Sequence, residues 1–467
     1  MQYFGTDGIR DRANQGNMTA AMALALGQAF GLWLKSKHSE VEPLSIVLGQ
    51  DTRVSGDMLA SAAAAGVASS GVNVYMTKIM PTPGIAYLVK NNKFYGGVVI
   101  SASHNPYFDN GLKFFKHGGI KLNNNDEAEI EKLLTADLSG MIAQVSRPGI
   151  VNLLPGPDKQ YSDYMIGIFA KDIFQDMRVI LDCANGAASF IAKNIFHALG
   201  AKAFTMFDMP NGVNINENCG SEHPEHLARA VKNLEADVGF AFDGDGDRML
   251  AVDANGTILT GDQSIIILAE LLRAKGRLQP GDTIVTTTMS NLGLRQAAKR
   301  LELEYIAAEV GDRHVLREML KNGAVLGGED SGHIILLDSQ TTGDGILSAL
   351  RLLEAMVYFQ KPLAELTQGM TVFPQKLLNI NVKRKPELES VPRIREAIRA
   401  GEERLEGNGR VLVRYSGTQP VCRVMVEGES LAIVENICNE IAKVVENALN
   451  DGSAGEMPVS ETTTDFE

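Results

Sequence analysis

The sequence predicts an α/β protein with three similar mixed-sheet domains and a smaller C-terminal α+β domain. Short β-branched runs alternate with helical stretches, which is typical of mixed or parallel sheets covered by helices. The alternation begins near residue 46 and restarts at residues 178 and 283, and after Thr371 a different pattern follows. A length of 467 residues is enough for roughly three domains.

The first unit opens with an apolar stretch, residues 20–34, that we interpret as a buried helix. This stretch is shorter than the ~20 residues that a membrane span needs. A strand at 46–48, an alanine-rich helix at 58–70 and strands at 72–76 and 97–101 follow.

The later units repeat the alternation in shorter form. The second has a strand at 178–181, a helix near 190–199 and a strand near 203–206, and the third has a strand at 283–285, a helix from Leu292 and a strand near Tyr305. The C-terminal unit has a charged helix around 391–405, strands at 411–415 and 422–427, and a final helix from about 430 to 449. The expected domains therefore cover residues 1–153, 154–253, 254–370 and 371–450. The polar, acidic segment 451–467 has little to bury, and we expect a disordered tail.

Composition excludes several classes of protein. The net charge of −13 argues against nucleic-acid binding, which usually needs a basic face. The four cysteines show no CxxC spacing, so we expect buried thiols in a reducing compartment. Because two aspartates precede the first apolar run and no cleavage site follows it, we expect a cytoplasmic protein with no membrane partner.

Three carboxylates alternate with glycines in Asp243-Gly244-Asp245-Gly246-Asp247, directly after an apolar run. Glycine lets the backbone turn tightly, so the carboxylates converge, and their mutual repulsion calls for a hard cation. An EF-hand loop is excluded, because its sixth and twelfth positions are Arg248 and Ala254 here. The competing interpretation is an acidic surface turn.

A serine follows the apolar run 97–100, in Ser101-Ala102-Ser103-His104-Asn105-Pro106. Ligands bind at the carboxyl ends of strands in open α/β sheets, so we expect Ser103 to be an exposed candidate nucleophile. Alone, a serine in such a turn is more often structural. The nearby segment Asp109-Asn110-Gly111-Leu112-Lys113 adds an expected turn and a cation.

Two further loops suit a sugar phosphate. Gly327-Gly328-Glu329-Asp330-Ser331-Gly332-His333 offers an acceptor, a hydroxyl and an imidazole for sugar hydroxyls. Arg414-Tyr415-Ser416-Gly417-Thr418-Gln419-Pro420, with Arg423 beyond it, offers guanidinium groups and backbone N–H groups for a phosphate. Each could instead be an ordinary polar loop. The sequence has no Walker A, GxGxxG or GxSxG motif, which disfavours nucleotide-dependent and α/β-hydrolase chemistry.

Together these loops resemble the α-D-phosphohexomutase superfamily, and within it the branch that acts on glucosamine phosphates. The resemblance runs from Phe4-Gly5-Thr6-Asp7-Gly8-Ile9-Arg10 to about Leu449 and leaves out only the tail. Four motifs in the same order make it specific. The choice of branch rests on the N-terminal motif and on Thr341-Thr342-Gly343-Asp344-Gly345. The resemblance implies that the four domains surround a central active-site cleft.

The resemblance also implies a set of site residues. The phosphoserine is Ser103, with Lys113, His333 and Arg10 near the reacting centre. One Mg²⁺ per subunit is held by Asp243, Asp245, Asp247 and the phosphorylated Ser103. The substrate contacts are Arg248, Glu329, Ser331, Arg414, Ser416, Gly417, Thr418 and Arg423. Two positions depart from the pattern: Asp11 replaces a glycine and Gln419 replaces a glutamate, and neither change removes a phosphate donor.

The implied reaction interconverts glucosamine 6-phosphate and glucosamine 1-phosphate through a phosphoserine and a glucosamine 1,6-bisphosphate intermediate. It would supply UDP-N-acetylglucosamine and cell-wall precursors. A mutase for glucose or mannose phosphates, a phosphatase that loses the group to water and an inactive sugar-phosphate binder stay open as alternatives. The oligomeric state also stays open, with a homodimer as one option.

Overall fold

The computed structural model describes residues 3–5, 7–416 and 420–450. The chain divides into two units. Residues 1–290 and 294–370 form the first, and residues 291–293 together with the chain from Thr371 form the second. The second unit begins where the sequence pattern changes.

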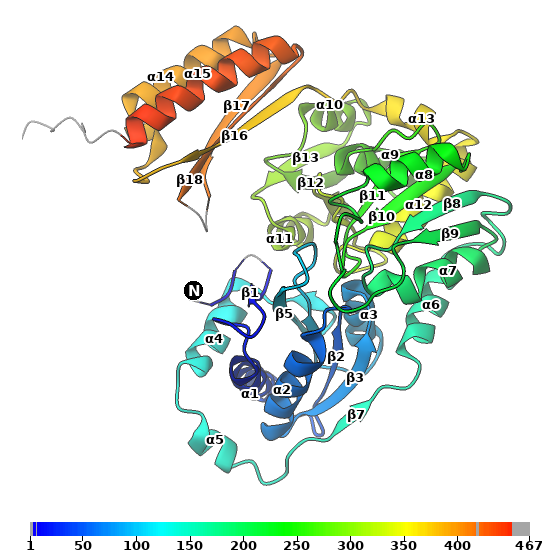
Figure 1. The fold of residues 1–467 in the computed structure, drawn as a ribbon, viewed down its shortest axis with the longest axis vertical. Coiled ribbons are helices and arrows are strands. Elements are labelled where there is room, and N and C mark those ends of the chain that lie inside the picture. The colour runs from blue at the N-terminus through cyan, green and yellow to red at the C-terminus, as the bar shows by residue number, and fades with distance from the viewer. Residues whose placement is uncertain (1–2, 6, 417–419, 451–467) are drawn as a thin grey trace, which may run out of the picture. The chain divides into compact units, whose positions relative to one another are not determined.

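The first unit starts with a seven-stranded sheet of order β1-β5-β4-β2-β3-β7, with β6 paired to β5. Figure 1 draws the strands of this sheet in blue to cyan. The strands β4, β2, β3 and β7 are parallel, whereas β5 runs antiparallel to β4 and β1. The strands are β1 (Ile9–Arg12), β2 (Ser45–Gln50), β3 (Asn73–Ile79), β4 (Gly96–Ile100), β5 (Asp109–Lys116), β6 (Ile120–Lys121) and β7 (Val151–Leu153). The helices are α1 (Ala20–Lys37), α2 (Gly56–Ser69), α3 (Thr82–Asn91), α4 (Asn124–Leu134) and α5 (Ser139–Ala143).

Alternation along β2 assigns its side chains to opposite faces of this sheet. Ile46 and Leu48 pack in one core with α1 and α2, whereas Val47 packs in another core with α3. Because both faces are covered, the central strands β2 and β4 are buried along almost their whole length. The buried helix expected at 20–34 lies within α1.

Two four-stranded sheets complete the first unit, with orders β11-β10-β8-β9 and β13-β12-β14-β15. The strands are β8 (Arg178–Asp182), β9 (Lys202–Met206), β10 (Val238–Phe242), β11 (Met249–Asp253), β12 (Thr283–Thr287), β13 (Glu304–Ala308), β14 (Leu326–Gly328) and β15 (Ile334–Leu336). The helices are α6 (Pro157–Gly167), α7 (Ala192–Ala198), α8 (Glu225–Asn233), α9 (Gly261–Ala274), α10 (Leu292–Arg300), α11 (Asp312–Asn322), α12 (Gly345–Phe359) and α13 (Leu363–Leu366). One continuous apolar core joins these two sheets through α9 and α12.

The three sheets share one design feature. In each, a parallel strand is followed by an antiparallel neighbour: β5 after β4, β11 after β10 and β15 after β14. The three loops that the sequence analysis singled out in this unit are the connections of these pairs. The three sheets of the first unit are therefore related in design, although no sequence repeat is evident.

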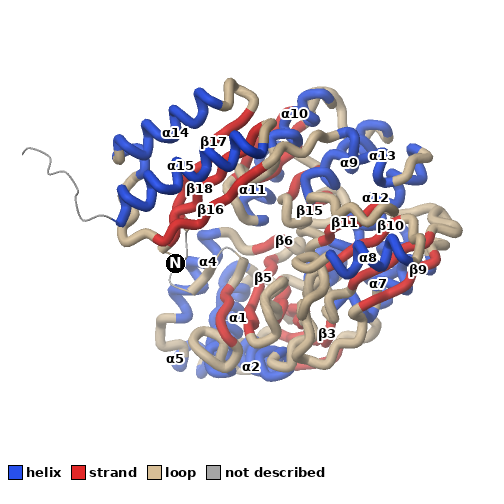
Figure 2. The backbone as a smooth tube through the Cα atoms, turned by 45° about the horizontal axis from the view of Figure 1, so that its top comes forward, coloured by secondary structure: helices blue, strands red, loops and turns tan. Residues whose placement is uncertain are grey.

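The second unit has a three-stranded antiparallel sheet of order β16-β18-β17. Its strands are β16 (Gln375–Asn381), β17 (Gly409–Tyr415) and β18 (Val421–Gly428), and its helices are α14 (Pro392–Arg404) and α15 (Leu431–Asn450). Figure 2 shows α14 and α15 beside each other along this sheet, and α15 contacts β16 and β18.

The predicted fold class of three mixed α/β domains and a smaller α+β domain is confirmed. The prediction of a turn at Asp109–Lys113 is wrong, because this segment lies in β5. The C-terminal unit has a strand that we did not expect, β16, whose sequence QKLLNIN mixes polar and apolar residues and contains no β-branched run. The helix expected near 190–199 corresponds to α7, and a short 3₁₀ turn, Ala187–Phe190, precedes it. Each sheet falls inside one of the expected domains, whose boundaries stay a prediction.

All four cysteines are free and buried, as predicted. Among the described residues, no helix combines the length and apolar character needed to cross a bilayer. The expected tail, 451–467, lies outside the described residues.

The crossing of α1 and α2 depends on two glycines. A Cβ at Gly66 would lie 2.1 Å from the Leu24 carbonyl oxygen, and one at Gly27 would lie 2.3 Å from that of Ala63. We expect Gly66→Ala to lower the free energy of unfolding by about 1–3 kcal/mol, because overpacking forces the helices apart. Gly167→Ala in α6, where nothing lies within 4 Å, is the matched control and should be at least as stable as wild type. Urea unfolding of both variants tests this, and equal stabilities would contradict it.

Candidate active site

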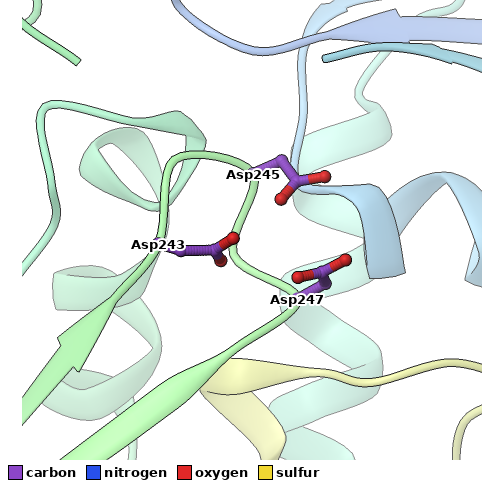
Figure 3. Close-up of side chains that lie close together, drawn as sticks. All are labelled: Asp243, Asp245 and Asp247. Atoms are coloured by element: carbon purple, nitrogen blue, oxygen red, sulfur yellow. The ribbon is translucent and has the colours of Figure 1, made fainter. Parts of the chain in front are cut away.

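The loop after β10 gathers three carboxylates at one point. Asp243, Asp245 and Asp247 are all buried, and one oxygen of each lies within 4.8 Å of the others. Figure 3 shows the three side chains directed toward a common centre from one tight loop. Gly246 sits within this loop at φ +71°, a backbone conformation that favours glycine. The interpretation as an exposed acidic turn is therefore wrong.

Charge at this cluster is only partly compensated by the polypeptide. Burial, followed by the Asp247 and Asp245 carboxylates, raises the pKa of Asp243 well above its usual range. Asp245 Oδ1 and Asp247 Oδ1 are buried and make no hydrogen bond within the described part of the chain. Converging hard oxygens of this kind suit a divalent cation such as Mg²⁺. The donor set thus fits the predicted metal site.

Ser103 lies beside this cluster and is buried, so the expectation that it is exposed is wrong. Its hydroxyl donates a 2.5 Å hydrogen bond to Asp243 Oδ2. Ser103 itself adopts φ +52°, which is uncommon for a non-glycine residue. The neighbouring ring nitrogen His104 Nδ1 lies 3.4 Å from Ser103 Oγ, and burial lowers the pKa of His104 to about 4. His104 is therefore neutral near pH 7, a feature to which the sequence analysis assigned no role.

Lys113 projects from β5 into the carboxylate cluster. Its Nζ lies 2.7 Å from Asp245 Oδ2, 3.3 Å from Asp247 Oδ2 and 2.9 Å from Asp7 Oδ2. Burial lowers the pKa of Lys113, but the three carboxylates outweigh burial and hold the pKa well above its usual value. In this geometry Lys113 is an ammonium that offsets carboxylate charge.

His333 lies on the other side of Asp247. Its Nδ1 is 3.7 Å from Asp247 Oδ1, and its Nε2 accepts a 3.1 Å hydrogen bond from the Gly343 N–H. The second predicted cation near the centre, Arg10, pairs with Asp7 at 2.6 Å. The structure thus brings Ser103, Lys113 and His333 around the three aspartates, with Arg10 joined to them through Asp7.

The residues predicted to contact the sugar lie close to the aspartate cluster. Arg248 donates its backbone N–H to Asp243 Oδ1 at 3.2 Å, and its guanidinium lies 3.6 Å from Glu222. The pKa of Arg248 is raised because the Asp247, Asp243 and Glu329 carboxylates outweigh burial. Glu329 accepts the Gly311 N–H at 2.9 Å, and the buried Ser331 hydroxyl has no hydrogen-bond partner among the described residues.

In the second unit, the two predicted phosphate-binding arginines are neighbours. Arg414 on β17 pairs in register with Arg423 on β18, and both Nε atoms are buried without a hydrogen bond in the described residues. Burial and the Arg423 charge lower the pKa of Arg414. Two adjacent guanidinium groups favour an anion. Ser416 is buried next to them, whereas Gly417 and Thr418 lie outside the described residues.

Sequence reasoning missed several residues that surround the centre. Asp7 Oδ1 accepts from Lys121 Nζ at 2.7 Å, and Lys121 also pairs with Asp312, whose Oδ2 lies 3.7 Å from His333 Nε2. The Thr82 hydroxyl donates to Asp245. These partners lie far apart in the sequence, so no local motif announces them; only Asp7 belongs to a quoted motif.

A serine beside three buried aspartates, on mixed α/β sheets, is an arrangement suited to phosphoryl transfer, because that reaction depends mostly on positioning and on the stabilisation of charge. The chain matches all four domain families described as phosphoglucomutase/phosphomannomutase: alpha/beta/alpha domain I over residues 1–140, domain II over 159–256, domain III over 260–373 and the C-terminal domain over 377–444. It therefore belongs to the phosphoglucomutase/phosphomannomutase family.

The chain is also similar over nearly its whole length to curated proteins named phosphoglucosamine mutase. The phosphoglucosamine mutase of Syntrophobacter fumaroxidans is 47% identical over 448 residues, which cover 96% of this chain and 99% of that protein. The phosphoglucosamine mutase of Carboxydothermus hydrogenoformans is 48% identical over 451 residues, covering 95% and 99%.

Solved structures share the fold. A phosphoglucomutase/phosphomannomutase family protein from Burkholderia thailandensis has a TM-score of 0.80 at 24% identity, with 95% of this chain and 97% of that chain covered. The Aspergillus fumigatus N-acetylphosphoglucosamine mutase, solved in complex with GlcNAc-6P and magnesium, has a TM-score of 0.68 at 17% identity, with 96% of each chain covered.

Gly343 allows no side chain beside His333. A Cβ there would lie 2.6 Å from His333 Nε2 and 2.6 Å from the Asp247 carbonyl oxygen. We expect Gly343→Ala to displace His333 from Asp247 and to lower kcat at least about tenfold, because small misplacements at a reacting centre are costly. Steady-state kinetics with a thermal melt measures both effects. Gly140→Ala, where nothing lies within 4 Å, is the control. A Gly343→Ala enzyme with the kcat of this control would contradict the expectation.

Proposed function

We propose that this chain is a phosphoglucosamine mutase that interconverts glucosamine 6-phosphate and glucosamine 1-phosphate. The observation that carries the proposal is the 2.5 Å contact between the Ser103 hydroxyl and Asp243, in a three-carboxylate cluster with unsatisfied oxygens. Curated relatives at 44–48% identity over nearly the whole chain are phosphoglucosamine mutases, which supports the choice of sugar. In the implied setting, the reaction supplies UDP-N-acetylglucosamine and cell-wall precursors.

In this proposal Ser103 carries the phosphoryl group. The free hydroxyl of a hexosamine monophosphate attacks phosphorus, the P–Oγ bond of phosphorylated Ser103 breaks, and the proton of the attacking hydroxyl leaves to a nearby base while the seryl oxygen takes one up. The resulting glucosamine 1,6-bisphosphate turns around, and its other phosphoryl group returns to Ser103. A Mg²⁺ ion held by Asp243, Asp245 and Asp247 would offset charge on the phosphoryl oxygens.

The remaining charged groups have distinct roles in the proposal. Lys113 stabilises negative charge at the transferring group, since the surrounding carboxylates keep it protonated. His333 is the candidate for moving a proton, and Arg10 binds phosphoryl oxygens. Glu329, Ser331 and Arg248 contact the sugar. Arg414, Ser416, Gly417, Thr418 and Arg423 form the cradle for the phosphate that is not reacting.

The wider setting is also a proposal. We place the enzyme in the cytoplasm, acting on small hexosamine phosphates without nucleic acid or membrane, with one Mg²⁺ per subunit and a homodimer as one possible assembly. Its domains cover residues 1–153, 154–253, 254–370 and 371–450, and the segment 451–467 is dispensable. A phosphomannomutase or phosphoglucomutase is the alternative function, supported by the description of the four matching domains.

A substrate comparison tests the function. Purified protein with Mg²⁺ and a trace of the matching 1,6-bisphosphate should convert glucosamine 6-phosphate to the 1-phosphate with a kcat/KM at least about tenfold above that for glucose or mannose phosphates. The mass of the intact protein should rise by one phosphoryl group after incubation with the bisphosphate, and that of Ser103→Ala should not. A preference for glucose or mannose phosphate would select the alternative, and release of free phosphate would indicate a phosphatase.

Metal binding by the aspartates is tested separately. Asp245→Asn should lose most activity and bind Mg²⁺ weakly, because an amide removes one negative charge from a hard-cation site. Mn²⁺ binding followed by electron paramagnetic resonance measures affinity without turnover. The control is Asp237→Asn, an exposed aspartate whose carboxylate accepts the Arg178 N–H. Normal metal affinity in Asp245→Asn would refute this assignment.

A further inference from the structure

Two side chains, from loops that follow strands of two different sheets, donate hydrogen bonds to the same two carbonyl groups of the serine loop. Arg53 Nη2 donates to the Ser103 carbonyl at 2.9 Å and to that of Asn105 at 2.7 Å. Asn216 Nδ2 donates to the same two oxygens, at 2.9 and 3.0 Å. A carbonyl oxygen has two lone pairs, so each of these acceptors is saturated by this pair of donors.

Arg53 belongs to the first sheet's own scaffold. Its side chain is fully buried, and its Nε donates to Asp51 at 2.9 Å. Its Nη1 donates to the carbonyls of Pro106 and Asp109, at the far end of the same loop. All three guanidinium nitrogens therefore donate hydrogen bonds, either to the loop or to Asp51. Arg53 thus supports the loop from within its own domain.

Asn216 reaches the loop from the second sheet's domain. It lies between β9 and α8, in a segment that also contacts the first domain, where the Val54 N–H donates to the Gly212 carbonyl at 2.8 Å. Two carbonyl acceptors fix the orientation of its amide, because the reverse orientation would set three oxygens against one another. Asn216 has φ +59°, and its own N–H donates to Ala184 at 2.9 Å.

The aspartate loop, residues 243–247, packs directly against this contact. A Cβ on Gly244, between the first two aspartates, would lie 2.7 Å from the Ser103 carbonyl oxygen and 2.9 Å from Asn216 Nδ2. The Ser103 main chain, the Asn216 amide and the aspartate loop are thus in direct contact. Asn216 holds the serine backbone against the loop that carries the cation ligands.

We propose that Asn216 is a positioning residue for phosphoryl transfer, acting with Arg53 to fix the main chain of Ser103 against the aspartate loop. The inference rests on the proposed function, in which Ser103 is the carrier. Ser103 has an uncommon backbone conformation, and its hydroxyl must stay within reach of both the aspartates and an incoming hydroxyl. Asn216 does not touch the reacting atoms, so its loss changes the rate of transfer and leaves substrate affinity in place.

Two substitutions remove the donor in different ways. Asn216→Asp replaces the amide by a carboxylate that cannot donate and faces two carbonyl oxygens. Asn216→Gly deletes the side chain and accepts φ +59° without strain, which keeps the test informative if the aspartate variant misfolds. Asn218→Asp is the matched control, because Asn218 is exposed in the same segment and has φ +51°.

We expect both Asn216 variants to lower kcat about ten- to a hundredfold, with KM for glucosamine 6-phosphate within about twofold of wild type. Single-turnover transfer from phosphorylated Ser103 to glucosamine 6-phosphate, followed by intact mass, should slow by the same factor. The melting temperature should stay near that of Asn218→Asp. Wild-type transfer rates in both Asn216 variants, or a raised KM with unchanged kcat, would overturn the inference. A wild-type enzyme that fails to act on glucosamine 6-phosphate would instead reject the proposed function.

Discussion

The convergence of three buried carboxylates after β10 is the constraint on which much of the first unit depends. Burying like charges together is costly unless cations or hydrogen bonds compensate them. The compensation comes from other sheets: Lys113 lies on β5 of the first, and His333 directly precedes β15 of the third. Since the cluster draws partners from both sides, it also fixes how the three sheets of the first unit meet.

That arrangement has a topological basis. Each of the three loops connects a parallel strand to an antiparallel neighbour, so each leaves a carboxyl end of a sheet and returns along the same edge. Ligand sites in open α/β sheets lie at such carboxyl ends. A tight return keeps each loop short, and a short loop on buried strands holds its side chains more firmly than a long one. Three such loops facing each other give a preorganised centre.

Local chemistry was readable from the sequence, and long-range chemistry was not. The three aspartates share one loop, and glycines at the intervening positions announce the tight turn. Ser103 stands out because it follows an apolar run. The contacts of Arg53 and Asn216 give no such signal, because their partners are main-chain carbonyls, which carry no residue identity. Lys121 and Asp312 look like ordinary surface charges until the fold pairs them.

The error at Asp109–Lys113 has a similar cause. Asp, Asn and Gly in succession have turn composition, yet Asn110 is buried and its amide donates to Ser55 Oγ at 2.8 Å. Gly111 is required by close approach, since a Cβ there would lie 2.7 Å from the Ser101 carbonyl oxygen. The turn propensity of this segment was overridden by tertiary contacts, which no short stretch of sequence contains.

Arg53 and Asn216 donate hydrogen bonds to main-chain carbonyls of the serine loop, whereas the Ser103 hydroxyl contacts the aspartates. In the proposed mechanism Ser103 gains and loses a phosphoryl dianion in each cycle, and side-chain contacts to that group would have to break and reform each time. Hydrogen bonds to the backbone of Ser103 and Asn105 involve no atom of the transferred group. The frame that holds the carrier can therefore stay the same whether the carrier is loaded or empty.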